Sequence, residues 1–238
     1  MKKITCLFLA ISFVLCLAGC ASEPTEQQTA KKQSYTDVSY PLASTYTPDQ
    51  EYEMEQLVTP NAELTAKGCP NLSQNLQELY AGAQEMVRAF NQCRFSAVVP
   101  GLTREINGMN YLVVGDSRFP DYEQFIAYLQ TLFTTDFITE TLLTKDSCVQ
   151  PSSDGLVCVI DAGVGDDITY AGHVFTVTDQ TPYKIEMTAT VYFSNDAWTG
   201  DRFYTAPQTP EAFTTANLNF TIVKTDNGWR FSKCPFIG

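Results

Sequence analysis

The sequence has 238 residues, of which 44% are apolar and 12% are aromatic, with 15 basic against 27 acidic side chains. This apolar content is typical of a folded core, so disorder over the whole length is excluded. A net charge of −12 supplies no broad basic surface for phosphate backbones, and no nucleic acid is expected as a partner.

The first nineteen residues have the layout of a secretory signal peptide. Lys2 and Lys3 precede an apolar run from Ile4 to Leu17, and the small residues Ala18 and Gly19 follow. The run is shorter than the roughly 20 apolar residues that a membrane-spanning helix needs. We therefore predict that residues 1–19 are a signal peptide that is removed.

The end of this segment also predicts how the mature protein is held in place. Leu17, Ala18, Gly19 and Cys20 resemble the lipobox of bacterial lipoproteins, which implies acylation of Cys20 as the new amino terminus. Two acyl chains anchor a protein stably in a bilayer. We expect a lipid-anchored protein on the extracytoplasmic face of the cell membrane. Ordinary cleavage after Gly19, with an unmodified cysteine, is the alternative.

The mature chain begins with a polar stretch. Residues 20–66 are rich in Ser, Thr, Gln, Glu and Pro, and their few apolar residues follow no sustained period. Such a composition predicts a flexible tether from the lipidated Cys20, followed by a single domain over residues 67–238. The scattered tyrosines leave open that part of this stretch packs along the domain.

Three helices are predicted in the first half of the domain. The first begins at Asn71, where Gln74 completes a capping-box pattern, and its apolar stripe runs to Phe90. After an extended piece over 109–114, a second helix begins at Pro120 and Asp121. A short third helix follows from about residue 134.

The second half of the domain is predicted to form β-strands. Alternating or β-branched runs occupy residues 156–160, 174–178, 183–193, 218–224 and 229–233, and Asn227-Gly228 suits the tight turn between the last two. Helices followed by an antiparallel meander predict an α+β fold, with the helices packed on a curved antiparallel sheet.

Five cysteines follow Cys20, so at least one must stay unpaired within the chain. Cys148 and Cys158 flank a turn-rich segment, which predicts a disulfide across a hairpin. Cys69 and Cys93 bracket the first helix and lie too far apart to pair, so Cys234 is expected to pair with one of them. No CxxC spacing is present, and no metal site is predicted.

Candidate catalytic residues are few, and none is predicted to act. His173 is the sole histidine and is expected at the surface or at a strand edge, without a recognisable nucleophile or a GxSxG elbow. The acidic loop 161–167 could bind calcium, but it does not match the EF-hand register and reads as plain turns. Asp116 and Glu123 lie where a helix begins, which accounts for both carboxylates. No cofactor is expected.

The connection from Asn195 to Ala216 is the strongest candidate for a binding site. It is long for a compact domain, and it carries Trp198, Arg202, Phe203 and Tyr204. Aromatic side chains beside an arginine are typical of interface anchors. The alternative is that these rings fold back and cover the open end of the sheet.

The order of elements, ending in the run Asn227 to Phe231, resembles the nuclear transport factor 2-like (cystatin-like) cone of many bacterial lipoproteins. More narrowly, residues 111–116, 119–133, 134–143 and 155–159 are similar to the DL-endopeptidase inhibitor family. The resemblance implies a non-enzymatic protein that blocks a cell-wall hydrolase through a protruding loop, its acidic surface meeting a basic partner. The long aromatic loop and the five mature cysteines depart from the pattern.

Two functions follow as predictions. The first is a membrane-anchored binding or inhibitory domain that acts on a cell-wall-associated protein through the loop 195–216. The second is a small-molecule site, or a simple acid-base enzyme, in the mouth of the cone around Asp161, His173 or Tyr192.

Overall fold

The computed structural model describes residues 60–238. The predicted signal peptide, the acylation site at Cys20 and most of the predicted tether lie outside the described residues. The described elements in chain order are α2 (Ala62–Ala66), α3 (Gln74–Asn91), β1 (Val98–Ile106), β2 (Met109–Val114), α4 (Tyr122–Leu132), α5 (Thr135–Phe137), a π-helical turn (Ile138–Leu142), β3 (Val149–Pro151), β4 (Val157–Ile160), β5 (Tyr170–Gln180), β6 (Lys184–Phe193), a 3₁₀ turn (Pro210–Ala212), β7 (Thr214–Thr225) and β8 (Gly228–Lys233). Helices and antiparallel strands therefore confirm the predicted α+β class.

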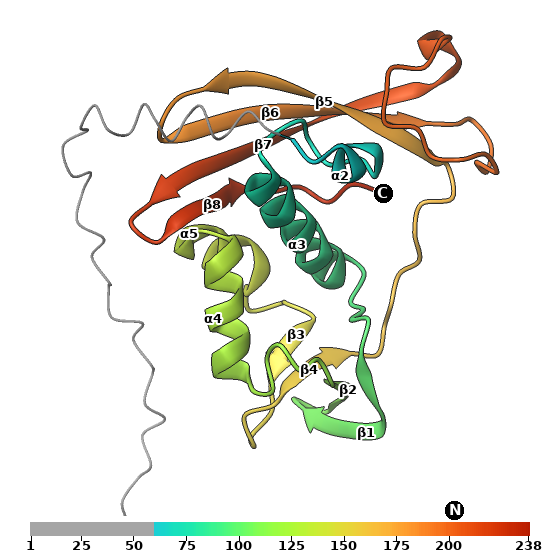
Figure 1. The fold of residues 1–238 in the computed structure, drawn as a ribbon. Helices are drawn as coiled ribbons and strands as arrows, with labels where there is room; N and C mark the ends of the chain where they lie inside the picture. The colour runs from blue at the N-terminus through green and yellow to red at the C-terminus, as the bar shows by residue number, and fades with distance from the viewer. Residues whose placement is uncertain (1–59) are drawn as a thin grey trace, which may run out of the picture. The chain divides into compact units, whose positions relative to one another are not determined.

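The strands form two four-stranded antiparallel sheets, where the sequence analysis expected one. The first sheet has the order β1-β2-β4-β3 and the second has the order β5-β6-β7-β8. The second sheet is a plain meander, in which each strand pairs with the next one along the chain (Figure 1). The extended piece predicted over 109–114 is β2, but its hairpin partner β1 was missing from the predicted elements.

Helix α3 packs its apolar stripe on the second sheet. The ring of Tyr80 makes edge or tilted contacts with Phe175 on β5, Phe220 on β7 and Phe231 on β8, with ring centroids 5.3 to 6.4 Å apart. Strand β6 alternates buried and half-buried residues along most of its length, as its sequence predicts. Figure 1 shows α3 beginning beneath this sheet and extending from it toward the first sheet. Burial of one helical stripe against one face of a sheet provides one part of the apolar core, and α4, the turn after it and the first sheet provide much of the rest.

Helix α4 and the first sheet complete the domain. Asp121 caps α4 by accepting a hydrogen bond from the backbone N–H of Gln124 at 2.8 Å. The buried Phe125 packs on the rings of Phe90 and Phe119, which ties α4 to the end of α3. Val157 and Val159 of β4 face this same core, while Cys158 between them joins a smaller cluster on the other face of the sheet.

The beginning of the domain differs from the prediction in two details. Ser73, and not Asn71, is the residue that precedes the first turn of α3. The last five residues of the stretch predicted as tether form α2, whose cap residue Asn61 accepts from the N–H groups of Glu63 and Leu64. The backbone N–H of Asn61 also donates to Gln77 Oε1 at 2.7 Å, so the folded part begins before residue 67.

Candidate functional site

The structure divides the predicted binding residues of the 195–216 connection into two groups. Trp198 and Phe203 pack on each other and on Phe213 and Tyr192, with ring centroids 5.3 to 6.1 Å apart. These rings cover the end of the second sheet, which is the alternative that the sequence left open. Arg202, by contrast, is exposed. Arg202 and Tyr204 belong to a separate hollow.

The connection is held to β5 by backbone pairing at Gly172. The N–H of His173 donates to Phe203 O at 3.1 Å, and the N–H of Phe203 donates to Ala171 O at 3.1 Å. A β-carbon at Gly172 would lie 2.0 Å from the carbonyl oxygen of Phe203. Glycine is therefore required here, because any side chain would push this backbone away.

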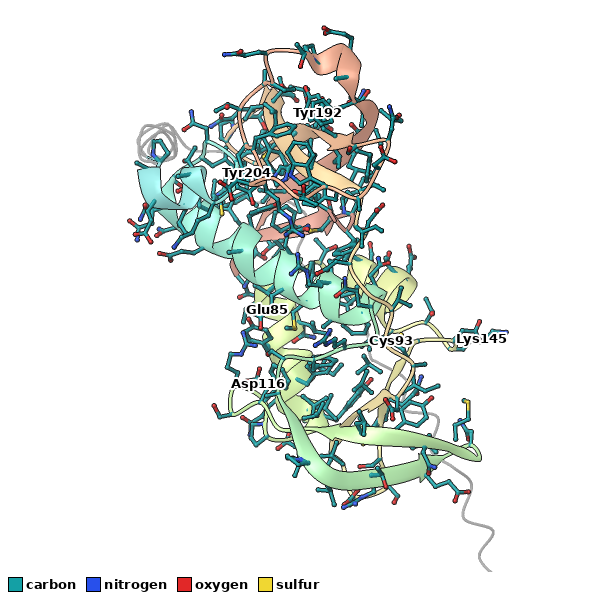
Figure 2. The ribbon with its side chains drawn as sticks, turned by 90° about the vertical axis from the view of Figure 1, so that its right-hand side faces the viewer. Glu85, Cys93, Asp116, Lys145, Tyr192 and Tyr204 are labelled. Atoms are coloured by element: carbon teal, nitrogen blue, oxygen red, sulfur yellow. The ribbon has the colours of Figure 1, made fainter. Side chains whose placement is uncertain are left out.

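A hollow of about 260 Å³ opens beside Tyr204, and we call it the cationic hollow. Its lining includes Lys67 after α2, Arg88 on α3, and Arg202 on the aromatic connection, together with Tyr170, His173 and Tyr204. Among the residues that the structure describes, no aspartate or glutamate lines it. Three cations from three separate segments thus surround one surface hollow in a chain with a strong excess of acid. Figure 2 shows Tyr204 near one end of α3, and Tyr192 within the second sheet.

His173 lines the cationic hollow and is only 5% exposed. Its Nε2 lies 2.8 Å from Gly68 O, and its Nδ1 lies 2.6 Å from the hydroxyl of Tyr170. Because a carbonyl only accepts, Nε2 carries the proton, and Nδ1 accepts from the Tyr170 hydroxyl. Burial lowers the pKa of His173, which favours this neutral form. The expected surface position is wrong, although β5 is an edge strand.

Aromatic rings set the positions of the charged groups at the rim. The Arg202 guanidinium lies over the ring of Tyr170, 4.8 Å from its centroid, and Tyr204 meets His173 edge to face at 5.2 Å. Burial is also the main reason that the pKa of the Tyr170 hydroxyl is raised, so this group stays protonated and donates to His173. Arg202 is therefore oriented by stacking and not by a carboxylate.

Neither Arg88 nor Arg202 forms an ion pair with a carboxylate inside the described part of the chain. Lys67 pairs with the exposed Glu63 at 2.6 Å, within a single turn of helix. The two arginines thus keep their guanidinium donors available to a ligand. An arginine fork matches the geometry of a carboxylate, which makes an acidic group the best chemical match for the hollow.

The predicted disulfide between Cys148 and Cys158 is not formed. Both are free thiols, and β4 places Cys158 opposite Gln150. Cys148 packs against the main core, whereas Cys158 belongs to the small cluster on the opposite face of the first sheet. Cys69, Cys93 and Cys234 are also free, and α3 runs without a break past Gly82, so Cys69 and Cys93 stay apart as expected.

The candidate acidic sites have ordinary partners. Asp116 binds Arg118 at 2.6 Å, and the same guanidinium reaches Glu85 at 2.6 Å, so no acid pair forms with Glu123 (Figure 2). In the loop 161–167, Asp166 accepts from Gln92 Nε2 at 2.7 Å. Within residues 60–238, no group of three or more His, Cys, Asp or Glu side chains is placed to hold a metal ion.

Two comparisons with known proteins identify no family for this chain. No protein-family model matches the sequence, and a search of the curated proteins finds no match either. None of the helices over residues 60–238 is long and apolar enough to span a membrane.

The sequence analysis missed half of the cationic hollow. Neither Lys67 nor Arg88 was singled out from the sequence. Tyr170 precedes the strand that was predicted to begin at residue 174. Only the tertiary fold brings these residues to Arg202 and Tyr204, because no local spacing connects positions so far apart in the chain.

Proposed function

We propose that this protein is a non-enzymatic binding domain on the extracytoplasmic face of the cell membrane, anchored by acylated Cys20. Its binding face is the cationic hollow with the adjoining connection 195–216. Its partner is a cell-wall-associated protein, such as a peptidoglycan hydrolase, that presents a carboxylate to the hollow.

The observation that carries this proposal is the charge of the hollow's lining. Lys67, Arg88 and Arg202 converge there without a lining carboxylate, although the whole chain has a net charge of −12. At physiological ionic strength, exposed charges are largely screened beyond about 8 Å. Within that range Glu63 offsets the charge of Lys67, and Asp166 offsets part of the charge of the two arginines, so a partner's carboxylate would respond mainly to the guanidinium groups of Arg88 and Arg202. The acidic remainder of the surface would meet basic groups around that carboxylate, which gives the contact its orientation.

The protonation states of the described groups support binding over catalysis. Both ring nitrogens of His173 are engaged, and its pKa is lowered by burial. Burial raises the pKa of the Cys69 thiol, the one thiol that lines the hollow. Carboxyl groups with shifted pKa values are all lowered, chiefly by hydrogen bonds: Glu63, Asp116, Asp154, Asp166 and Asp167. A general acid or base needs a pKa near the working pH, and none of these shifts moves a group that way.

The size of the hollow favours a side chain over a free small molecule. Its volume of about 260 Å³ falls below the range of roughly 300 to 1,000 Å³ that is usual for small-molecule pockets. A carboxylate on a short side chain fits such a space. A small free acid is the second candidate, because the same three cations would hold it.

We further propose that α3 with β5–β8 is the cystatin-like unit that the sequence resembles. The support is the packing of a single long helix on a four-stranded antiparallel meander, through Tyr80 and the rings of Phe220 and Phe231. This unit carries Arg88 and Arg202, whereas the first sheet lies outside it.

Site-specific photo-crosslinking in the native envelope tests the function. A photoreactive amino acid at the exposed Thr205, next to the hollow, is compared with one at Tyr183, which is 62% exposed at the turn between β5 and β6. We expect a crosslinked protein from position 205 only. Its yield should fall at least tenfold with Arg202→Gln and stay unchanged with Arg104→Gln, which removes an arginine of β1 that pairs with Asp154 and does not line the hollow.

Equal crosslinking from both positions, or a yield that Arg202→Gln does not change, would contradict the proposal. Native mass spectrometry of the full chain is the second arm. A small acid that remains bound, and is lost with Arg202→Gln, would favour the small-molecule alternative.

A further inference from the structure

A second hollow lies on the neighbouring stripe of α3, and we call it the thiol hollow. Its volume is about 420 Å³, and its lining includes Cys93, Cys148 and Cys234. Three of the five described cysteines thus share one hollow, although they come from three distant parts of the sequence.

Two of these thiols converge on one backbone atom. The Sγ atom of Cys148 lies 3.2 Å from the carbonyl oxygen of Phe90, and the Sγ atom of Cys93 lies 3.9 Å from the same oxygen. Both thiols therefore lie within hydrogen-bond reach of the same carbonyl oxygen. The presence of the Cys93 thiol also adds to the effect of burial in raising the pKa of Cys148.

The backbone holds both cysteines in place. Cys93 adopts a left-handed conformation with φ of 49°, at the end of α3 where glycine is usual. The next residue, Arg94, closes the helix with an N–H bond to Ala89 O at 3.0 Å. At the other side, Ile160 donates to Cys148 O at 2.9 Å, which fixes Cys148 against β4. A side chain tolerated at a position that favours glycine points to a use for that side chain.

The other cysteines are less well placed. Cys234 is buried, and its Sγ accepts from Gln84 Nε2 at 3.3 Å. Cys69 lines the cationic hollow, and Cys158 faces the small cluster of the first sheet.

We propose that Cys93 and Cys148 are joined by a disulfide bond in the exported protein. Each thiol loses its hydrogen and an S–S bond forms between the two Sγ atoms. The two electrons and two protons pass to the disulfide of a thiol oxidoreductase, which becomes a dithiol. This step rests on the proposed export, because cytosolic thiols are kept reduced.

The bond would fasten the end of α3 to the strand β3. It closes the loop of residues 93–148, which contains β1, β2 and α4. A long closed loop restricts the unfolded chain strongly, so the bond should raise the melting temperature by about 10 °C. Thiol–disulfide exchange needs a thiolate, and burial disfavours the thiolate form of these cysteines. Their oxidation in air should therefore be slow at pH 7, and an oxidoreductase should accelerate the oxidation.

The test uses the full chain, first reduced and then incubated with oxidised glutathione and a disulfide isomerase. Peptide mapping after acid quenching and alkylation should find a linked pair of peptides that contain Cys93 and Cys148. The rise in melting temperature should be absent in Cys148→Ser and retained in Cys158→Ser. Alkylation of all the described cysteines, a link to Cys234 or Cys69 instead, or the same rise in Cys148→Ser would overturn the proposal.

The same mapping on protein from native envelopes separates this proposal from the proposed function. If the link forms in the purified chain but is absent in the native protein, the two thiols can pair but the protein is not exported to an oxidising compartment. That result would overturn the proposed disulfide because the proposed export fails. A link that is absent in both would overturn the disulfide alone, since crosslinking from position 205 does not depend on it.

Discussion

The two hollows beside α3 differ in how the fold builds them. Tyr80, Gln84 and Arg88, spaced four residues apart, line the cationic hollow, whereas Val87 and Asn91 on the neighbouring stripe line the thiol hollow. The cationic hollow depends on a long connection that is held to β5 by a few backbone bonds. The thiol hollow lies between the ends of regular elements. Our two proposals therefore place a binding face and a disulfide on adjacent stripes of one helix.

The substitution with the largest expected effect displaces the connection beside the cationic hollow and leaves the thiol hollow unchanged. Gly172→Ala places a β-carbon 2.0 Å from Phe203 O, so the backbone of the connection must move away from β5. We expect a loss of about 2 to 4 kcal/mol in the free energy of unfolding, and a red shift of Trp198 fluorescence as its ring packing is lost.

Gly165→Ala is the matched control for this change, because no atom lies within 4 Å of the β-carbon it would add. It should change neither stability nor fluorescence. Gly172→Ala with an unaltered denaturation midpoint would mean that the connection does not depend on its pairing with β5.

The second effect concerns Gln84, which links the helix to the carboxyl-terminal segment. Its Nε2 donates to Pro235 O at 2.8 Å and to Cys234 Sγ, and its Oε1 accepts from Ile237 N at 3.3 Å. Gln84→Ala should cost about 1 to 3 kcal/mol and increase the alkylation rate of Cys234.

Gln74→Ala, at the exposed first turn of α3, is the comparison for Gln84. It should leave Cys234 unreactive. Gln84 lines the cationic hollow and bonds Cys234 and Pro235, which line the thiol hollow. If Gln84→Ala also leaves Cys234 unreactive, other contacts hold the carboxyl-terminal segment, and Gln84 does not link the two hollows.

The third effect is a dependence on pH that comes from His173. Its pKa is lowered by burial, so the unfolded chain binds the proton more readily, and stability falls as pH drops below about 6.5. Between pH 7 and 5.5, this loss can reach about 1.3 kcal/mol. Tyr170, Phe175 and Tyr204 pack against the ring, and the positive charge of Arg202 also lowers its pKa. Carboxyl groups with a shifted pKa, such as Asp166, have a lowered pKa, so they change the stability only at more acidic pH.

His173→Gln should flatten the dependence of stability on pH between 7 and 5.5, whatever its effect at pH 7. Denaturant unfolding at several pH values measures this slope. A variant that loses as much stability on acidification as the wild type would show that another group titrates in this range.

The substitution with the smallest expected effect on stability, Arg202→Gln, distinguishes a role in binding from a role in folding. Arg202 is exposed and is held by its contact with the Tyr170 ring, so Arg202→Gln should cost less than about 1 kcal/mol of stability. Denaturation of the variant checks this. A loss above about 2 kcal/mol would mean that Arg202 supports the fold, and reduced crosslinking could not then be assigned to binding.

Regular elements with strong periodicity could be predicted from the sequence. Helices α3 and α4 and strand β6 follow their apolar spacing, and Asp121 caps α4 as its position indicates. Strand β2 was predicted as an extended piece, but Pro100 and Gly101 interrupt β1, so the sequence analysis missed the hairpin. Its turn residues Asn107 and Gly108 both have positive φ, which is the local signal that could have found it.

The pairing of the cysteines could not be predicted from the sequence. The prediction assumed that the hairpin turns midway between Cys148 and Cys158. In the structure Pro151 pairs with Val157, so the turn is centred one residue later and Cys158 lies opposite Gln150. Cys148 precedes β3 and turns toward the end of α3, a neighbour that only the tertiary fold supplies. The cationic hollow was missed for the same reason.

The most direct test of the central claim is the affinity of the crosslinked partner, once purified, for two variants of the full chain. Arg88→Gln with Arg202→Gln removes the two guanidinium groups of the cationic hollow that lack an ion pair, and Arg104→Gln removes an arginine from β1. We predict that the first variant binds at least tenfold more weakly than the wild type, and that the second binds within twofold of it. Equal affinities for both variants would contradict the assignment of the hollow as the binding site.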